Sequence, residues 1–232
     1  MTAERERSGR EMKKRVGAIL RQPELEAALE QALHLPLRQV VNPLCGQLAT
    51  GDGPIKWRAV SVLGAVVARL AEEELEAARN VMRRLVWTLS DESGGIGWGA
   101  PEAMGEATAR SEALADGFAH VLVAFIRQDG NYLEFEPLHP GILWGIGRLA
   151  RARREHALDA APHLPPYLES PDPAIRGTAA WAALALPTGA TAAHLERLRG
   201  DPSVFPLYEG GVLADVRIGD LVARGLARLP PA

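Results

Sequence analysis

The chain has 232 residues, of which 47% are hydrophobic and 24% are charged, and its formal net charge is −3. This composition is typical of a globular protein and excludes a disordered chain. The slight negative charge argues against nucleic acid as a partner. Because the chain has a single cysteine, Cys45, it excludes an intrachain disulfide and argues against a cysteine-based zinc site.

The N-terminal residues are charged throughout and lack the apolar core of a signal peptide. The longest uncharged run, 177–193, is interrupted by Pro187 and is a poor candidate for a membrane span. We therefore expect a soluble, cytoplasmic protein without a membrane segment.

Helices are predicted along the whole chain, because Ala, Leu, Glu and Arg dominate and alternating β-branched runs are absent. In chain order we expect an N-terminal capping helix and then five helices, each followed by a helix of a second kind. Gly, Pro and Asp clusters, such as those at 51–54, 91–95 and 170–173, mark the turns between them. The capping helix is predicted at about 10–32 and the five helices at about 33–50, 72–90, 111–128, 156–169 and 190–200.

The helices of the second kind begin with a repeated motif. The stretch from Gly53 reads GPIKWRAVSVLGAVVAR and the stretch from Gly94 reads GGIGWGAPEAMGEATAR, so that Trp57 and Trp98 lie 41 residues apart. A weaker copy, HPGILWGIGRLARAR, follows, and Ile175-Arg176 and Val216-Arg217, again 41 residues apart, are expected to open two more helices. A fixed period of this length predicts stacked helix pairs that share one core. We expect one domain over 1–232, with repeats at about 33–70, 72–112, 111–154, 156–187 and 190–229.

One of these copies resembles the second helix of a HEAT-like repeat. The segment Asp172-Pro173-Ala174-Ile175-Arg176 precedes an Ala-rich helix, and Asp215-Val216-Arg217 is a second copy. The resemblance covers most of residues 33–229 and implies an all-α fold, a right-handed α-α superhelix of about five helix pairs with an N-terminal capping helix. It also implies that the Asp and Arg residues of the motif link adjacent repeats. Since Trp57, Trp98 and Pro140 depart from the family pattern, the chain resembles a divergent bacterial member.

Two positions of the second copy carry acids where the first copy does not. Glu102 and Glu106 replace Ser61 and Ala65, one turn apart on one face of the predicted helix. The glycines before this helix permit close approach of a ligand or of a neighbouring chain segment. Alternatively, both acids are solvated, or they pair with Arg148 or Arg151 of the next repeat. As functional residues they would contribute little stability, so replacing both by alanine is expected to leave it nearly unchanged.

The connection at 129–140 is the second unusual segment, because it is long and rich in acids and aromatic residues. Loops on a rigid scaffold often carry function. In a stacked array it is expected to lie beside 94–106 and to complete an acidic, partner-binding pocket. Tryptophans in this pattern are alternatively core residues. The candidate residues are Trp98, Glu102, Glu106, Tyr132, Glu134, Glu136, His139 and Trp144.

We predict no catalytic residues, no metal ligands and no cofactor, because no motif for such chemistry is present. The resemblance favours a non-enzymatic protein-binding scaffold that uses its concave face and the 94–106 and 129–140 segments. One alternative is an enzyme of the HEAT-like DNA glycosylase type. Its damaged nucleotide would be held by Trp98, Trp144, Glu102 and Arg148. The need of such an enzyme for basic phosphate contacts conflicts with the net charge. The other alternative is a repeat protein that handles a small ligand or cofactor.

Overall fold

The computed structural model describes residues 2–90 and 93–228, with side chains from residue 8 onward. The chain forms two compact units, Met1–Leu114 and Ala115–Ala232. The turn predicted at 91–95 and the end of the last predicted repeat fall partly outside the described residues.

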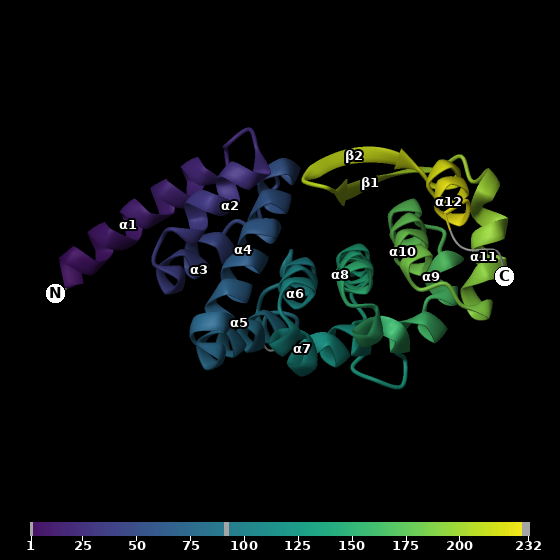
Figure 1. Cartoon of the computed structure of the whole chain (residues 1–232), viewed down its shortest axis with the longest axis horizontal. Coiled ribbons are helices and arrows are strands. Elements are labelled where there is room, and N and C mark those ends of the chain that lie inside the picture. The colour runs from purple at the N-terminus through teal and green to yellow at the C-terminus, as the bar shows by residue number, and fades with distance from the viewer. Residues whose placement is uncertain (1, 91–92, 229–232) are drawn as a thin grey trace. The chain divides into compact units, whose positions relative to one another are not determined.

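The first unit is helical in its described part, and α4 lies at its centre (Figure 1). This helix packs against α2, α3, α5 and α6. Its N-terminus is set by Asp52, whose side chain accepts a hydrogen bond from the backbone N–H of Ile55 at 3.1 Å. The helices are α1 (Thr2–Ile19), α2 (Leu25–Leu33), α3 (Leu37–Cys45), α4 (Gly53–Glu73), α5 (Leu75–Trp87), α6 (Ala100–Arg110) and the start of α7 (Glu112–Ala124).

The second unit is built around α10, which packs against α8, α9, α11, α12 and a β-hairpin. After the remainder of α7 it contains η2 (Glu136–Leu138), α8 (His139–Ala152), η3 (Arg154–His163), α9 (Pro165–Leu168), α10 (Pro173–Ala185), α11 (Gly189–Arg197), η4 (Leu198–Gly200), β1 (Val204–Glu209), β2 (Val212–Arg217) and α12 (Ile218–Leu226).

The alternation of two kinds of helix is confirmed. The motif helices are α4, α6, α8, α10 and α12, and the intervening helices are α3, α5, α7, the η3–α9 pair and α11. Asp172 caps α10 by accepting from the backbone N–H of Ala174 at 2.7 Å. Arg176 donates to Asp201 at 2.7 Å and to the Ser203 hydroxyl at 3.0 Å, which ties α10 to the segment after α11. The structural role that the HEAT resemblance implies for Asp172 and Arg176 is thus supported by their contacts.

The predicted capping helix at 10–32 is wrong in one respect, because two helices occupy this segment. The chain turns at 20–24, where Pro23 lacks the N–H that a helix needs and disfavours a helical residue before it. Arg58 of α4 stabilises the turn, since its guanidinium donates to the carbonyl oxygens of Gln22 at 2.6 Å and Pro23 at 3.2 Å.

The helix predicted to open at Val216-Arg217 is α12, with Arg217 as its N-cap, but a β-hairpin that the sequence does not predict leads into it. Val216 and Arg217 end β2, and α12 begins only at Ile218. Gly210 and Gly211 have φ values of +58° and +84°, as the two-residue turn of a tight hairpin requires. Asp215 therefore lies on a strand and does not cap a helix, so the resemblance of this copy to a HEAT motif was misleading.

Candidate functional site

Glu102 and Glu106 of α6 are buried, each with 3% of its surface exposed. Glu102 accepts a hydrogen bond from the Lys56 ammonium of α4 at 2.6 Å, and Glu106 accepts one from the Arg110 guanidinium of its own helix at 2.6 Å. The interpretation of both acids as solvated residues is therefore wrong. Pairing with arginines of the second unit stays a prediction.

Gly64 of α4 makes room for Glu106. A Cβ atom at Gly64 would lie 2.4 Å from Cγ of Glu106, so any larger residue would collide with that side chain. Oε2 of Glu102 is buried and has no hydrogen-bond partner within the described residues. Lys56 thus links Glu102 to α4, whereas Arg110 pairs with Glu106 within α6, and Glu106 packs against Gly64 of α4. Both acids therefore take part in the packing of α6 on α4.

The glycines before α6 serve the packing of the chain on itself. Gly97 and Gly99 have φ values of +69° and +76°. A Cβ atom at Gly97 would lie 2.7 Å from the Leu89 side chain, and one at Gly99 would lie 2.8 Å from Cβ of Leu48. Of the two roles predicted for these glycines, close approach of a neighbouring segment is the one that the contacts support.

The tryptophans divide into two groups. Trp144 and Trp181 are core residues with 3% and 2% exposure, and their rings stack at 6.0 Å and 9°. Trp144 also donates from Nε1 to the Tyr208 carbonyl oxygen at 2.8 Å, so its proposed place in a binding pocket is wrong. Trp57 is half-buried, whereas Trp98 is 38% exposed. The prediction that the tryptophans are core residues is therefore confirmed for Trp144 and Trp181 but not for Trp57 and Trp98.

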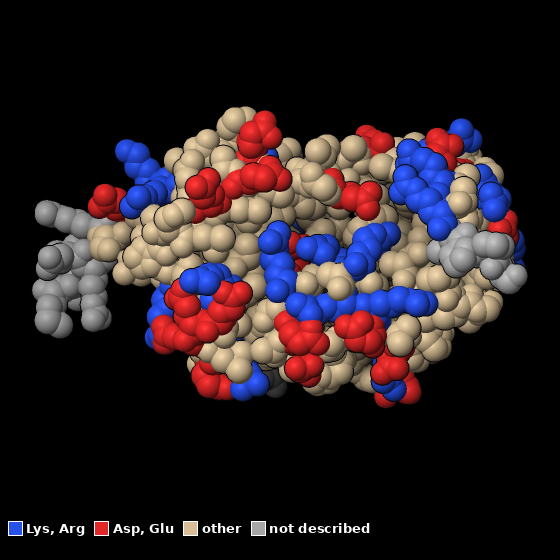
Figure 2. Space-filling view, in the orientation of Figure 1, with Lys and Arg blue, Asp and Glu red and all other residues tan. Residues whose placement is uncertain are grey.

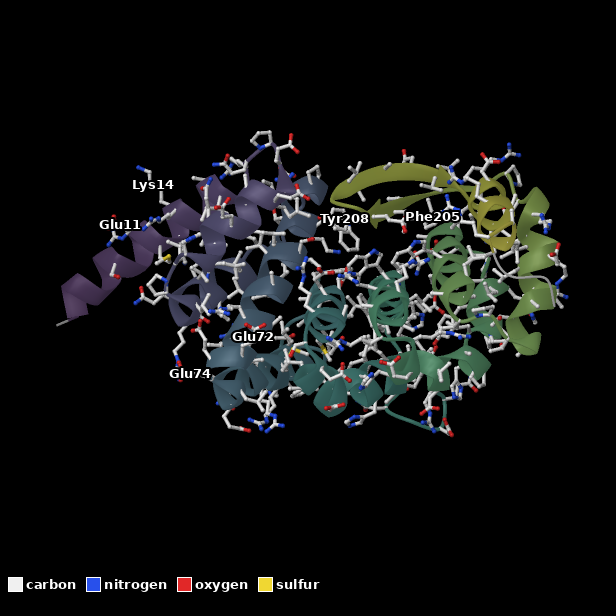
Figure 3. All side chains as sticks on the ribbon, viewed as in Figure 1. Glu11, Lys14, Glu72, Glu74, Phe205 and Tyr208 are labelled. Carbon is white, nitrogen blue, oxygen red and sulfur yellow. The ribbon has the colours of Figure 1, made fainter. Side chains whose placement is uncertain are left out.

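The β-hairpin completes this core from one side. Phe205 and Tyr208 are labelled on β1 in Figure 3, and both are buried. The Phe205 ring lies against Gly177 of α10, and the Tyr208 ring centroid lies 6.1 Å from that of Trp144. Beside the stacked tryptophans, the Arg151 guanidinium lies 3.6 Å from the Trp181 ring centroid, a cation–π contact. Burial lowers the pKa of Arg151 to about 10, so this side chain stays charged at neutral pH. The hairpin and Arg151 therefore belong to the packing of the second unit.

The predicted loop at 129–140 lines a cavity of about 540 Å³ in the second unit. This volume lies in the range of about 300–1,000 Å³ that ligand pockets occupy. The opposite wall comes from the segment between η3 and the first turn of α10. The lining residues are Ile126, Gln128, Asp129, Tyr132, Glu136, His139, Pro162, His163, Pro166, Tyr167, Ser170, Pro171, Asp172 and Ile175.

Aromatic rings form one wall of the cavity. His139 is 3% exposed, and its Nε2–H donates to the Leu133 carbonyl oxygen at 2.8 Å. Its ring contacts Tyr167 edge-on at 5.3 Å between centroids and Tyr132 at 5.7 Å. Burial, together with the neighbouring Tyr132, raises the pKa of the Tyr167 phenol well above its usual range. Tyr167 therefore remains a neutral part of this wall at physiological pH.

Carboxylates lie at the rim. Asp129 receives two hydrogen bonds from Arg127, both at 3.1 Å, and this guanidinium lowers the pKa of Asp129. Asp172 lines the cavity and at the same time caps α10, and Glu136 lines it with an exposed side chain. Glu134, the other acid predicted for the site, is exposed and is not among the residues that line the cavity.

A second cavity, about 590 Å³, lies between α3 and α5 of the first unit. Its charges compensate one another, because Arg38 forms an ion pair with Glu74. The neighbouring α5 surface shows acidic and basic side chains side by side (Figure 2), in keeping with the ion pairs of Glu76 with Arg79 and Arg83. This cavity offers no net charge or aromatic wall for a ligand.

The predicted site is thus divided between the units. Tyr132, Glu136 and His139 share the cavity of the second unit, while Trp98, Glu102 and Glu106 belong to the first. Sequence reasoning missed the wall opposite the loop, which contains Tyr167 and three prolines, Pro162, Pro166 and Pro171. The proline-rich run at 162–173 is the signal for this wall in the sequence, although its residues predict the end of a helix and a turn.

No helix in the described part of the chain is long and apolar enough to cross a membrane.

Comparisons with known proteins concern mainly the fold. No protein-family model matches the chain. An uncharacterized protein of Archaeoglobus fulgidus is 26% identical over 171 residues, which cover 74% of this chain and 87% of that protein.

Two solved structures cover nearly the whole chain at 16% identity. An engineered protein from the Northeast Structural Genomics Consortium superimposes over 94% of this chain and 95% of its own, with a TM-score of 0.52. A designed armadillo repeat protein in complex with the peptide (KR)4 covers 94% and 98%, with a TM-score of 0.51. Likeness at this identity shows the fold alone. The chain has the armadillo/HEAT-type helical-repeat fold.

Proposed function

We propose that this protein is a non-enzymatic scaffold that binds a protein partner through an extended peptide segment. The observation that carries the proposal is the cavity of the second unit, since a loop anchored between helices supplies one of its walls. A rigid scaffold that holds such a loop is a common basis for recognition. The designed armadillo neighbour with its bound peptide supports the same kind of role for this fold.

The binding region that we propose includes Tyr132, Glu136 and His139. Tyr132 is 37% exposed, so its ring offers both an apolar face and a hydroxyl to a partner. Pro162, Pro166 and Pro171 add a wall with little conformational freedom to lose on binding. Participation of the 94–106 segment and of a concave face stays a prediction, for which Trp98, at 38% exposure, is the most accessible of the candidates there.

Selection from a random peptide display library against the purified 232-residue chain tests this function. We expect enriched peptides that bind the wild type and lose affinity for Tyr132→Ala. Leu158→Ala is the matched control, because Leu158 is also a large exposed apolar residue, at 45%, but does not line the cavity. If no peptide is enriched, or if Leu158→Ala weakens binding as much as Tyr132→Ala, the proposal is wrong.

A further inference from the structure

The lining of the second-unit cavity is negatively charged. Asp129, Glu136 and Asp172 line it, and the described lining residues include no Lys or Arg. Arg127 balances the charge of Asp129. Asp172 caps a helix through Oδ1 without an ion pair, and the Glu136 side chain makes no hydrogen bond or ion pair within the described part of the chain. Two carboxylate charges therefore remain to attract a cation.

The aromatic wall suits a cation as well. The centroid of the His139 ring lies 5.7 Å from that of Tyr132 and 5.3 Å from that of Tyr167. The face of an aromatic ring attracts a cation within about 6 Å of its centroid, and the attraction grows as water is excluded. Since Tyr132 is partly exposed, its ring is accessible to a ligand that enters between the loop and the proline wall.

His139 adds a hydrogen-bond acceptor. A carbonyl oxygen only accepts, so the contact of Nε2 with the Leu133 oxygen requires the proton on Nε2. On the neutral ring Nδ1 is then an acceptor, and it has no partner among the residues that the structure describes. Although the His139 side chain is only 3% exposed, Nδ1 is not one of the fully buried atoms without a partner in the described chain, so it is accessible to a ligand. A ligand with N–H donors would supply the missing hydrogen bond.

We propose that this cavity is a binding site for a guanidinium cation. A guanidinium group is planar, always charged and carries five N–H donors, so it can stack on Tyr132 while it donates to Glu136 and to Nδ1 of His139. An ammonium group would meet the charge but not the planar face. The ligand is either a free guanidino compound or an arginine side chain on a partner. The site does not depend on the scaffold function proposed above.

Isothermal titration calorimetry on the full chain at low salt tests the inference with three probes. Agmatine represents a free guanidino compound, and N-acetyl-arginine methylamide represents a peptide-borne one. N-acetyl-citrulline methylamide is nearly the same shape as the second probe but uncharged. We expect the arginine probe to bind about tenfold more tightly than the citrulline probe. Equal affinity of agmatine and the arginine probe indicates a free ligand, and tighter binding of the arginine probe indicates a peptide.

Variants at exposed positions locate the site without disturbing the fold. Glu136→Gln should weaken guanidinium binding about threefold or more, whereas Glu134→Gln, two residues away and outside the cavity, should leave it unchanged. Tyr132→Ala should weaken binding, and Tyr132→Phe, which keeps the ring face, should restore it. Thermal unfolding of each variant confirms that it is folded.

Three results would overturn the inference. They are equal binding of the arginine and citrulline probes, equal loss in Glu134→Gln and Glu136→Gln, and no binding of either cation at millimolar concentration. The peptide-library selection fails independently of these titrations. Agmatine binding without any enriched peptide would remove the scaffold function and leave the cation site in place.

Discussion

Replacing Glu102 by alanine should destabilise the protein, although the sequence predicts nearly unchanged stability for the joint removal of this residue and Glu106. Glu102 is 3% exposed, and its Oε1 lies 2.6 Å from the Lys56 ammonium. The substitution removes the partner of Lys56 and leaves a small void between α4 and α6. Burial, which the sequence could not reveal, is the reason for the opposite expectation.

The size of the effect follows from three contributions. Removing one partner of a fully buried ion pair costs about 3–5 kcal/mol. The Lys56 side chain is 22% exposed and can turn toward water, which reduces this cost. The wild type also carries an unpaired buried oxygen, Oε2 of Glu102, at a cost of about 1–3 kcal/mol that the variant avoids. The net loss should be about 1–3 kcal/mol, or roughly 2–12 °C in Tm for a chain of this size.

Differential scanning calorimetry of Glu102→Ala, Lys56→Met and the double variant measures the loss and the coupling between the two residues. Glu134→Ala is the control, because an exposed residue without partners should change stability by less than about 0.5 kcal/mol. If Glu102→Ala melts at the same temperature as Glu134→Ala, Glu102 is not a structural ion-pair residue and the reasoning fails.

Three further predictions concern stability. Gly64→Ala should cost about 1–3 kcal/mol in urea denaturation, because the new methyl group would meet Glu106; Gly117→Ala, with open space around it, should be neutral or slightly stabilising. Trp181→Ala should cost about 3–5 kcal/mol by the same measurement, since this ring is 2% exposed, and a loss below 1 kcal/mol would contradict its core role. Burial raises the pKa of Asp201, but hydrogen bonds from its arginine and serine partners outweigh burial and hold the pKa below its ordinary value. The stability that Asp201 contributes is therefore present above its unfolded pKa of about 3.9 and is lost as pH falls through the lower folded value, so Tm of Asp201→Asn should depend less on pH between about 5 and 2 than Tm of the wild type.

The repeat of 41 residues was enough to predict the alternation of helices, because helix-start chemistry is local. Asp172 shows this well, since a cap followed by Pro173 specifies a helix start from neighbouring residues alone. The same local reasoning did not predict the β-hairpin that precedes α12, where the two glycines at 210–211 form a tight turn and the backbones of β1 and β2 pair. Pairing between strands is not visible in a helix-start motif.

The candidate site shows where sequence reasoning ends. The sequence by itself determined that the loop at 129–140 is unusual, and Tyr132, Glu136 and His139 of that loop do line one cavity. Only the tertiary structure decided that the facing wall comes from 162–175 and that Glu102 pairs with Lys56 of the preceding motif helix. Residue types and spacing report which side chains share a helix face, whereas burial and the choice of partner depend on how separate segments pack, and packing brings together residues that are distant in the chain.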